Sequence, residues 1–391
     1  MLCNNITEKL LGMQDVEVKN IENKDKNIVN ITLRLKRKPH KCPCCGNMTD
    51  KIHDYRKQNI KDIPMFGNNT IITLEKRRYA CSCGKRFIEK VDFLPRYHRM
   101  TKRLILYVID KLRSPVSFTY IANEVGLSVS TVIRIFDYVS YGKPELPKAI
   151  AIDEFKGNTG GEKYNCIITD PVNRRVLDIL PKRKYSYLST YFRSFNNRND
   201  VDLFVSDMWK TYADISKTFF KKADLVIDKY HWIRQVMWAF DSVRKDVQKK
   251  LGSEYRKYFK RSRKILFKRF NELSEYQKQK VMVMLSISPN LYSAHFMKEE
   301  FFKILDCKDH KKAKELLLEW MDYAKSSNFK RFQKCADTFY NWFSGITNSL
   351  NTPVTNGFTE GCNNKIKVLK RNAYGYKNFS RFRKRILHIF N

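Results

Sequence analysis

Three acidic side chains stand where a carboxylate could serve as a metal ligand. Asp153 lies near the end of the apolar run AIAIDEF, and Asp207 ends the similar run DLFVSD. Glu360 lies near the start of a helical segment, NGFTEGCNNKIKVLKR, on a face with amide and basic groups. An unpaired charge within a strand is costly, so these positions indicate hard oxygen ligands for Mg²⁺ or Mn²⁺. Two such ions would suit phosphoryl transfer.

Five of the ten cysteines form two clusters, CPCCG and CSCG. Closely spaced thiolates followed by glycine are typical of zinc sites, because the glycine lets backbone N–H groups turn toward the sulfurs. The expected ligands of one structural Zn²⁺ are Cys42, Cys45, Cys81 and Cys83. The second pair is one residue shorter than CxxC, so three other side chains could replace a thiolate: Cys44, His40 and His98. Buried free thiols are the alternative interpretation.

The charge of the chain indicates a polyanionic partner. The formal net charge is +36, from 76 Lys and Arg against 40 Asp and Glu, spread along 391 residues. Nucleic acid is the first candidate, and a lysine-rich proteome is the other explanation. The sequence has no apolar run of about 18 residues, and MLCNNITEKLLGMQ lacks the features of a signal peptide. We therefore expect a nucleic-acid-binding protein of the cytoplasm that is not associated with a membrane.

Other polar groups compete with the three acids or could assist them. Glu154 follows Asp153 directly, and Asp228 precedes His231 by three residues in VIDKYHWIRQ. Asp228 and His231 could position DNA or assist the site, or His231 could simply cap and pack. Each strand-end aspartate could equally be a helix N-cap. The basic and aromatic residues that could hold DNA near Glu360 are Lys365, Lys367, Arg371 and Tyr374, for which a solvated helix face is the alternative.

Residues 100–140 have helical periodicity and contain FTYIANEVGLSVSTVIRIFDYV. This pattern predicts a helix-turn-helix with Gly126 in the turn and Ser128 as N-cap of the second helix. Ser128, Ser130 and Arg134 would face the major groove and nearby phosphates. An ordinary helical hairpin is the alternative.

The remaining sequence predicts the elements that must position the acids. Three antiparallel strands are expected from AIAIDEF, KYNCIITD and RRVLDIL, and two further strands from DLFVSD and ADLVID. Helical periodicity then dominates up to residue 350. The expected parts are a zinc-binding β segment at 1–95, the helix-turn-helix at 100–140, a catalytic core at 148–232, a helical region at 233–350, and the C-terminal part of the core at 351–391.

The ordered motifs resemble those of DDE transposases of the ISL-three insertion-sequence family. They are CPCCG with CSCGKRF, then IANEVGLSVSTV, AIDEFKG, VSDMWKTY, DKYHWIRQV and the C-terminal TNGFTEGCNNKIKVLKRNAYGYKNFSRFRKRIL. The resemblance covers nearly the whole chain. It implies an α+β multidomain fold with an RNase-H-like catalytic domain and a large all-helical insertion. It also assigns the catalytic triad to Asp153, Asp207 and Glu360.

The resemblance implies cleavage at terminal inverted repeats and joining of the 3′-OH ends to target DNA. We also expect a homodimer or higher oligomer on DNA, associated with the nucleoid in the bacterial cytoplasm. Two other functions fit the same motifs: a zinc-containing transcriptional regulator without catalysis, and a metal-dependent nuclease that only hydrolyses.

Overall fold

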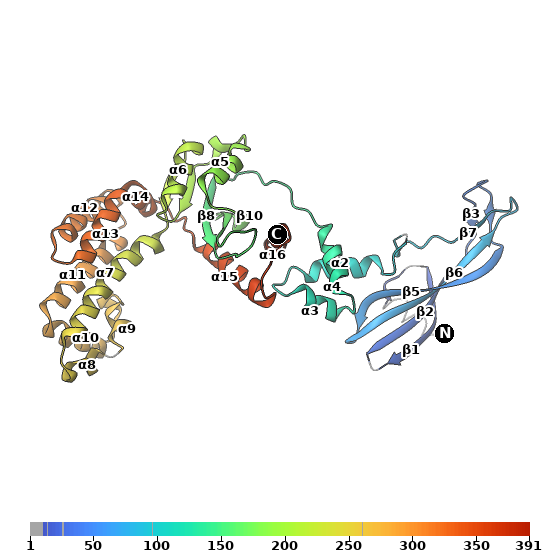
Figure 1. Ribbon diagram of the computed structural model, residues 1–391, viewed down its shortest axis with the longest axis horizontal. Coiled ribbons are helices and arrows are strands. Elements are labelled where there is room, and N and C mark those ends of the chain that lie inside the picture. The colour runs from blue at the N-terminus through green and yellow to red at the C-terminus, as the bar shows by residue number, and fades with distance from the viewer. Residues whose placement is uncertain (1–10, 14, 26, 96, 260) are drawn as a thin grey trace. The chain divides into compact units, whose positions relative to one another are not determined.

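The computed structural model describes residues 11–13, 15–25, 27–95, 97–259 and 261–391 (Figure 1). The first ten residues of the expected zinc-binding segment lie outside this range. The chain divides into two compact units. One comprises the chain up to residue 141 with 366–376 and 380–390, and the other comprises 142–365 with 377–379. The C-terminal stretch 351–391 therefore contributes to both units.

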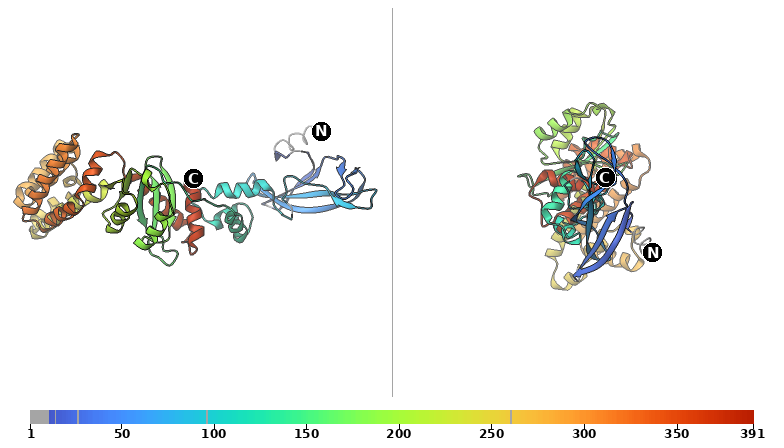
Figure 2. Two further views of the ribbon diagram at one scale, coloured as in Figure 1. Left: turned by 90° about the horizontal axis from the view of Figure 1, so that it is seen from above. Right: turned by 90° about the vertical axis from the view of Figure 1, so that its right-hand side faces the viewer.

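The first unit begins with a five-stranded sheet. Its order is β1 (Val16–Asp25), β2 (Ile28–Leu35), β6 (Asn68–Ala80) and β5 (Ile52–Met65), with β7 (Arg86–Ile88) also paired to β6. Alternating residues of β2 and β6 face a core that includes Ile31, Leu33, Ile72 and Leu74. The short hairpin β3 (His40–Lys41) and β4 (Met48–Thr49) carries the first cysteine cluster. Strands β5 and β6 run side by side as a long ribbon (Figure 2).

Three helices follow in the same unit: α2 (Lys102–Lys111), α3 (Phe118–Glu124) and α4 (Val129–Asp137). The predicted helix-turn-helix is formed by α3 and α4. Gly126 has φ +63° between them, and a Cβ there would come within 2.4 Å of the Asn69 side chain. The Ser128 hydroxyl accepts a hydrogen bond from Thr131 N at 3.2 Å, so the predicted N-cap is confirmed.

The last helix, α16 (Phe379–Phe390), completes the core of these three helices. Buried Arg385 donates hydrogen bonds to the carbonyls of Leu112, Ser114 and Val116, which follow the C-terminal end of α2. His388 bonds Ile109 O at 2.6 Å. A guanidinium at a helix C-terminus satisfies carbonyls that have no partner within the helix. The C-terminus of the chain therefore stabilises the helix-turn-helix.

The second unit contains a five-stranded sheet in the order β10–β9–β8–β11–β12. Its strands are β8 (Ala149–Phe155), β9 (Asn165–Asp170), β10 (Arg175–Leu180), β11 (Leu203–Ser206) and β12 (Asp224–Ile227). The first three are antiparallel, as predicted, whereas β8, β11 and β12 are parallel. Helices α5 (Tyr185–Arg193) and α6 (Lys210–Phe219) share a buried core with the sheet, and a 3₁₀ turn, η1, covers Arg198–Asp200.

Between β12 and α15 (Gly357–Asn372) the chain is helical (Figure 1). The helices are α7 (Lys229–Lys250), α8 (Ser253–Phe259), α9 (Ser262–Leu266), α10 (Glu275–Ile287), α11 (Pro289–Asp306), α12 (His310–Ser326), α13 (Lys330–Asn341) and α14 (Phe343–Asn351), with a 3₁₀ turn, η2, at Phe270–Glu272. Trp232, Phe301, Trp320 and Phe339 pack together at their centre. No helix among the described residues combines the length and the apolar character that a membrane crossing needs.

Candidate active site, zinc centre and DNA-binding elements

Three aspartates lie at the carboxyl ends of neighbouring parallel strands. Val205 of β11 pairs with Ala151 of β8, so two residues further on Asp207 is level with Asp153. Ser206 pairs with Ile227 of β12, which in turn brings Asp228 level with Asp207. Because side chains at the same level of neighbouring strands are adjacent, the sheet forms a row of carboxylates.

Asp153 and its neighbour Glu154 point to opposite faces of the sheet. Glu154 bonds Arg183 at 2.5 Å and Tyr212 at 3.3 Å, on the face covered by α6. Asp153 instead accepts a hydrogen bond from Asn363 of α15 at 2.9 Å. The alternation of strand side chains therefore separates these two acids. Glu154 is already neutralised by an arginine, whereas no ion pair joins Asp153 to a described Lys or Arg in the second unit.

Helix α15 brings Glu360 to the face of the sheet that carries Asp153. The Thr359 hydroxyl is 2.7 Å from the Thr169 hydroxyl of β9, and both residues are fully buried. Asn363 lies one helical turn after Glu360 and is itself buried. Asn363 is one of the amide groups on the polar face predicted for this helix, and its contact with Asp153 is not evident from the sequence. Its spacing of three residues from Glu360 was the available signal.

The tightest group of possible metal ligands around these acids differs from the predicted triad. Ligand atoms of Asp228, His231 and Glu360 lie within 4.8 Å of one another. Asp153, Asp207 and Glu360 form no group that tight among the described residues. They are nevertheless electrostatically coupled, since Asp207 and Glu360 both raise the pKa of Asp153. Glu360 therefore interacts with Asp153 electrostatically and lies nearest the Asp228–His231 pair.

Burial and mutual repulsion perturb this cluster. Burial, followed by the charges of Asp207, Glu154 and Glu360, raises the pKa of Asp153 to about 7. Burial and the charge of Glu154 raise the pKa of Asp207 to about 6. The pKa of Asp228 is also raised by burial. These carboxylates are thus costly to ionise together unless a cation joins them.

Several buried polar atoms around the acids have no hydrogen-bond partner within the described residues. They are Asp207 Oδ1, Asp228 Oδ2, Asn363 Oδ1, and both polar side-chain atoms of Asn356. Such atoms are rare in folded proteins and cost free energy. Four of the five are oxygens, which are the ligands that Mg²⁺ and Mn²⁺ prefer. The donor set therefore fits divalent cations.

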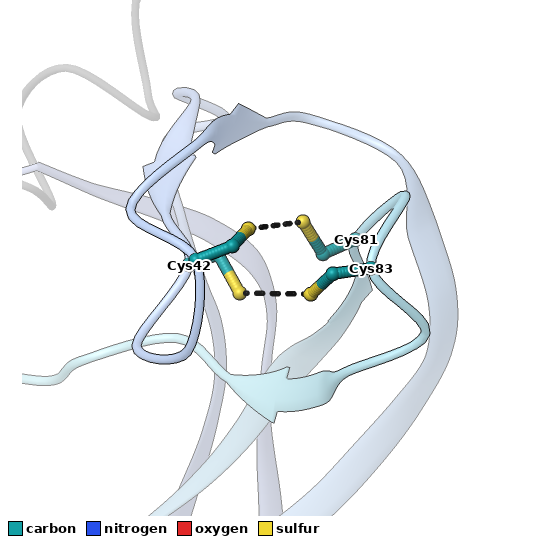
Figure 3. A group of neighbouring side chains, drawn as sticks. Cys42, Cys81 and Cys83 are labelled. Atoms are coloured by element: carbon teal, nitrogen blue, oxygen red, sulfur yellow. Dashed lines mark hydrogen bonds between the residues drawn. The ribbon is translucent and has the colours of Figure 1, made fainter.

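The two cysteine clusters meet at one point (Figure 3). Cys42 Sγ lies 3.7 Å from Cys83 Sγ, and Cys45 Sγ lies 3.4 Å from Cys81 Sγ. Zn–S bonds of 2.3 Å in a tetrahedron would hold sulfurs about 3.8 Å apart. The backbone N–H of Cys83 lowers the pKa of Cys81 to about 6, as the turn toward the sulfurs predicted. Four thiols at these distances support a structural zinc.

The three alternative zinc ligands lie outside this four-thiol group, the only cysteine cluster among the described residues that could hold a metal ion. His40 instead packs against Tyr79, with ring centroids 4.7 Å apart. The second pair, Cys81 and Cys83, is one residue shorter than CxxC, and both of its sulfurs nevertheless lie in the cluster.

The predicted DNA-contacting residues are exposed. Ser128, Ser130 and Arg134 lie on the solvent side of α4, opposite buried Val132 and Ile135. On α15, Lys365, Lys367 and Arg371 are exposed, and Tyr374 is fully exposed just after the helix. The buried face of α15 contains Cys362, Ile366 and Leu369, as predicted from its periodicity.

Family models match three consecutive parts of the chain. Residues 38–83 match a zinc-finger of transposase IS204/IS1001/IS1096/IS1165, and residues 89–140 match the helix-turn-helix domain of transposase family ISL3. Residues 150–386 match the transposase model of the same family. The three models together span the zinc centre, the helix-turn-helix and the carboxylate cluster.

Individual relatives agree with these matches. The transposase for insertion sequence element IS1001 of Bordetella parapertussis is 26% identical over 389 residues, 96% of each chain. The transposase for IS1557 of Mycobacterium tuberculosis is 26% identical over 140 residues, 36% of this chain and 31% of its own length. A Lactococcus lactis protein named ATP-dependent protease is 33% identical over 104 residues, only 27% of this chain.

Proposed function

Because this chain belongs to the ISL3 family of transposases, we propose that it binds the terminal inverted repeats of an insertion sequence, cleaves the ends, and joins their 3′-OH groups to target DNA. The single observation that carries the proposal is the carboxylate cluster, in which partnerless oxygens gather around Asp207, Asp228 and Glu360. A regulator that only binds DNA has no need of such a cluster.

The sheet order supports an RNase-H-like catalytic domain. Three antiparallel strands are followed by two parallel ones, and the first and second acids lie on adjacent strands at its centre. Residues 148–232 and 351–391 would form this core, and residues 233–350 would be the helical insertion before the third acid. The described residues of that interval form eight helices, which supports the assignment.

Asp153, Asp207 and Glu360 are the proposed ligands of two divalent ions, Mg²⁺ or Mn²⁺. When bound, such ions activate the attacking oxygen and stabilise the leaving oxygen of a phosphodiester. The protein's contribution is to hold its carboxylates ionised and correctly oriented. The Asn363 amide donates to Asp153, which leaves the other lone pairs of that carboxylate for the cation.

Asp228 and His231 are proposed to position Glu360. Arg234 donates to His231 Nδ1 at 3.3 Å, so the proton of a neutral imidazole is on Nε2. That Nε2 lies 3.9 Å from Asp228 Oδ2, and a ring nitrogen of His231 lies within 4.8 Å of a Glu360 carboxylate oxygen. Burial and the Arg234 charge lower the pKa of His231, which favours this neutral form. A neutral imidazole with its N–H beside two carboxylates suits a hydrogen-bond donor.

DNA recognition is proposed to involve Ser128, Ser130 and Arg134 of α4, which would enter the major groove. Lys365, Lys367 and Arg371 would hold DNA near Glu360 through phosphates. Zinc at Cys42, Cys45, Cys81 and Cys83 would stabilise the N-terminal segment. Two ends must be joined to one target, so a homodimer or higher oligomer on DNA at the nucleoid follows from the proposed reaction.

The test is cleavage and strand transfer with duplex oligonucleotides that end in candidate terminal repeats, in Mg²⁺. The intact protein should release a 3′-OH end and join it to a second duplex. Glu360→Gln should lower the rate by a factor on the order of 10³ while DNA binding is retained. Glu315→Gln, which removes an exposed acid from α12, is the matched control and should cleave normally.

Three outcomes would contradict parts of the proposal. Equal cleavage by Glu360→Gln removes that residue from the active site. Nicked DNA without any joined product supports a hydrolytic nuclease. Bound but intact DNA, with every terminal-repeat candidate, supports a regulator.

A further inference from the structure

A groove of about 1300 Å³ lies in the first unit beside the zinc centre. It is bounded by β5, β6, β7 and the segment that leads into α2. Seven lysines or arginines line it, including Arg56, Lys57, Lys76, Arg78, Arg86 and Lys90, against two acids among the described lining residues. This groove is separate from the exposed face of α4 that carries Ser128, Ser130 and Arg134.

The acids of the groove do not neutralise it. Glu89 is buried and accepts hydrogen bonds from Arg77, which faces away from the groove: 2.7 Å from its backbone N–H and 3.3 Å from its guanidinium. Asp92 is exposed, 3.5 Å from the equally exposed Lys90, where water screens the pair. Two further acids lie nearby: Asp54 is 3.6 Å from Arg56 and 3.4 Å from Arg78, and Glu75 is 3.6 Å from Lys57. Because seven basic groups line the groove, it still keeps a net positive charge.

The facing basic residues of β5 and β6 destabilise the sheet. Arg56 of β5 lies directly opposite Lys76 of β6, and like charges in facing positions of antiparallel strands are destabilising. Lys76 is half-buried, and its ammonium donates to neutral Gln58, not to an acid. A polyanion bound in the groove would remove this repulsion.

The lining of the groove favours duplex DNA over single strands. Its cations come from three separate segments, with Arg56 and Lys57 on β5, Lys76 and Arg78 on β6, and Arg86, Lys90 and Lys102 in the stretch from β7 to the start of α2, as suits contact with a phosphate backbone. Single-strand binding surfaces present several stacked aromatic side chains. Tyr97 is the one strongly exposed aromatic residue among the described residues that line this groove.

We propose that this groove binds the sugar–phosphate backbone of duplex DNA, independently of base sequence. The inference deepens the proposed function, because it assigns a second DNA contact to the zinc-bearing part of the chain. The groove would supply affinity, and α4 would supply base discrimination.

The test uses the full-length, zinc-loaded protein and a 40-base-pair duplex of random sequence, with affinity measured by fluorescence anisotropy from 50 to 300 mM KCl. The groove variant carries Arg56→Gln, Arg86→Gln and Lys90→Gln. The control variant carries Lys19→Gln, Lys24→Gln and Arg37→Gln, which remove the same charge from exposed positions of the same unit outside the groove. Zinc content is measured for both variants.

Each lost phosphate contact lowers the slope of log affinity against log salt by about 0.9. The groove variant should therefore lose about 2 to 3 from this slope and bind at least about tenfold more weakly, whereas the control should match the wild type. Arg56→Lys with Arg86→Lys keeps both charges and should restore the slope. If the two triple variants bind alike, or if the lysine variant fails to restore binding in a zinc-loaded protein, the inference is wrong.

The binding measurements test the groove separately from the proposed transposase activity. The groove variant should lose affinity equally for random and terminal-repeat duplexes, whereas Arg134→Ala should lower mainly the preference between them. Failure of cleavage by the intact protein would refute transposition without changing these binding results.

Discussion

The zinc centre and the carboxylate cluster gather metal ligands in opposite ways. The four cysteines come from two tight turns, and their sulfurs already lie near the spacing that zinc needs. The acids come from separate strands and a helix, and several of their oxygens lack partners. The thiols of the zinc centre are therefore already at the distances that a bound ion needs, whereas the carboxylates of the proposed catalytic site keep oxygens free to bind ions and substrate.

The largest expected effect is on the stability of the zinc centre. Cys42→Ser removes one of four thiolates, and structural zinc in small domains contributes about 10–16 kcal/mol of binding free energy. We expect loss of bound zinc and of ordered structure in residues 40–95. Zinc analysis and hydrogen exchange of that segment check this. Cys335→Ser, at a buried cysteine of α13 outside the cluster, should retain zinc, and full zinc content in Cys42→Ser would contradict the assignment.

The helix-turn-helix should stay folded when zinc is lost, because α16 packs on it and contributes Arg385 to its core. Arg385→Ala tests this contribution, since it removes a buried guanidinium that donates to three carbonyls after α2. We expect the helical core to lose about 3 kcal/mol, measured by hydrogen exchange in α2 and α4. Arg381→Ala breaks a half-exposed ion pair with Asp137 and should cost under about 1 kcal/mol. Equal effects would show that burial of Arg385 is unimportant.

The smallest expected effect concerns the carboxylate cluster. Because the folded-state pKa values of Asp153 and Asp207 are raised to about 7 and about 6, these two groups bind more protons in the folded protein than in the unfolded chain above about pH 4. Without added divalent ions, their contribution to stability should therefore fall as pH rises from about 4 to 7.

Asp153→Asn should flatten this pH dependence and raise the melting temperature at pH 7.5 by about 3 °C. Added Mg²⁺ should stabilise the wild type more than the variant. Thermal unfolding with and without Mg²⁺ measures both effects. An unchanged pH profile in Asp153→Asn would show that folding does not raise the pKa of this carboxyl group.

Much of the fold was predictable because its signals are local. The run AIAIDEF gave the bounds of β8, and Gly126 with Ser128 marked the turn of the helix-turn-helix. The long strand β5 was harder to identify, because IHDYRKQNIKDIPM is mostly polar, as suits one side of a basic groove.

The finer geometry of the site depends on long-range packing that the sequence does not display. Asn363 became recognisable as a partner of Asp153 only once α15 lay against β8. The grouping of Glu360 with Asp228 and His231 likewise depends on long-range packing, since the Asn356 N–H just before α15 donates to Asp228 at 3.3 Å. The sequence does not distinguish Arg385 from the many other basic residues, because its burial depends on the packing of α16 on α2.

The most direct test of the central claim is a crystal structure with terminal-repeat DNA and Mn²⁺, in which anomalous scattering locates the ions. The account predicts Mn²⁺ about 2 Å from carboxylate oxygens of Asp153, Asp207 and Glu360, with His231 directed at Glu360. Manganese that contacts neither aspartate, with Glu360 bound only to Asp228 and His231, would contradict it.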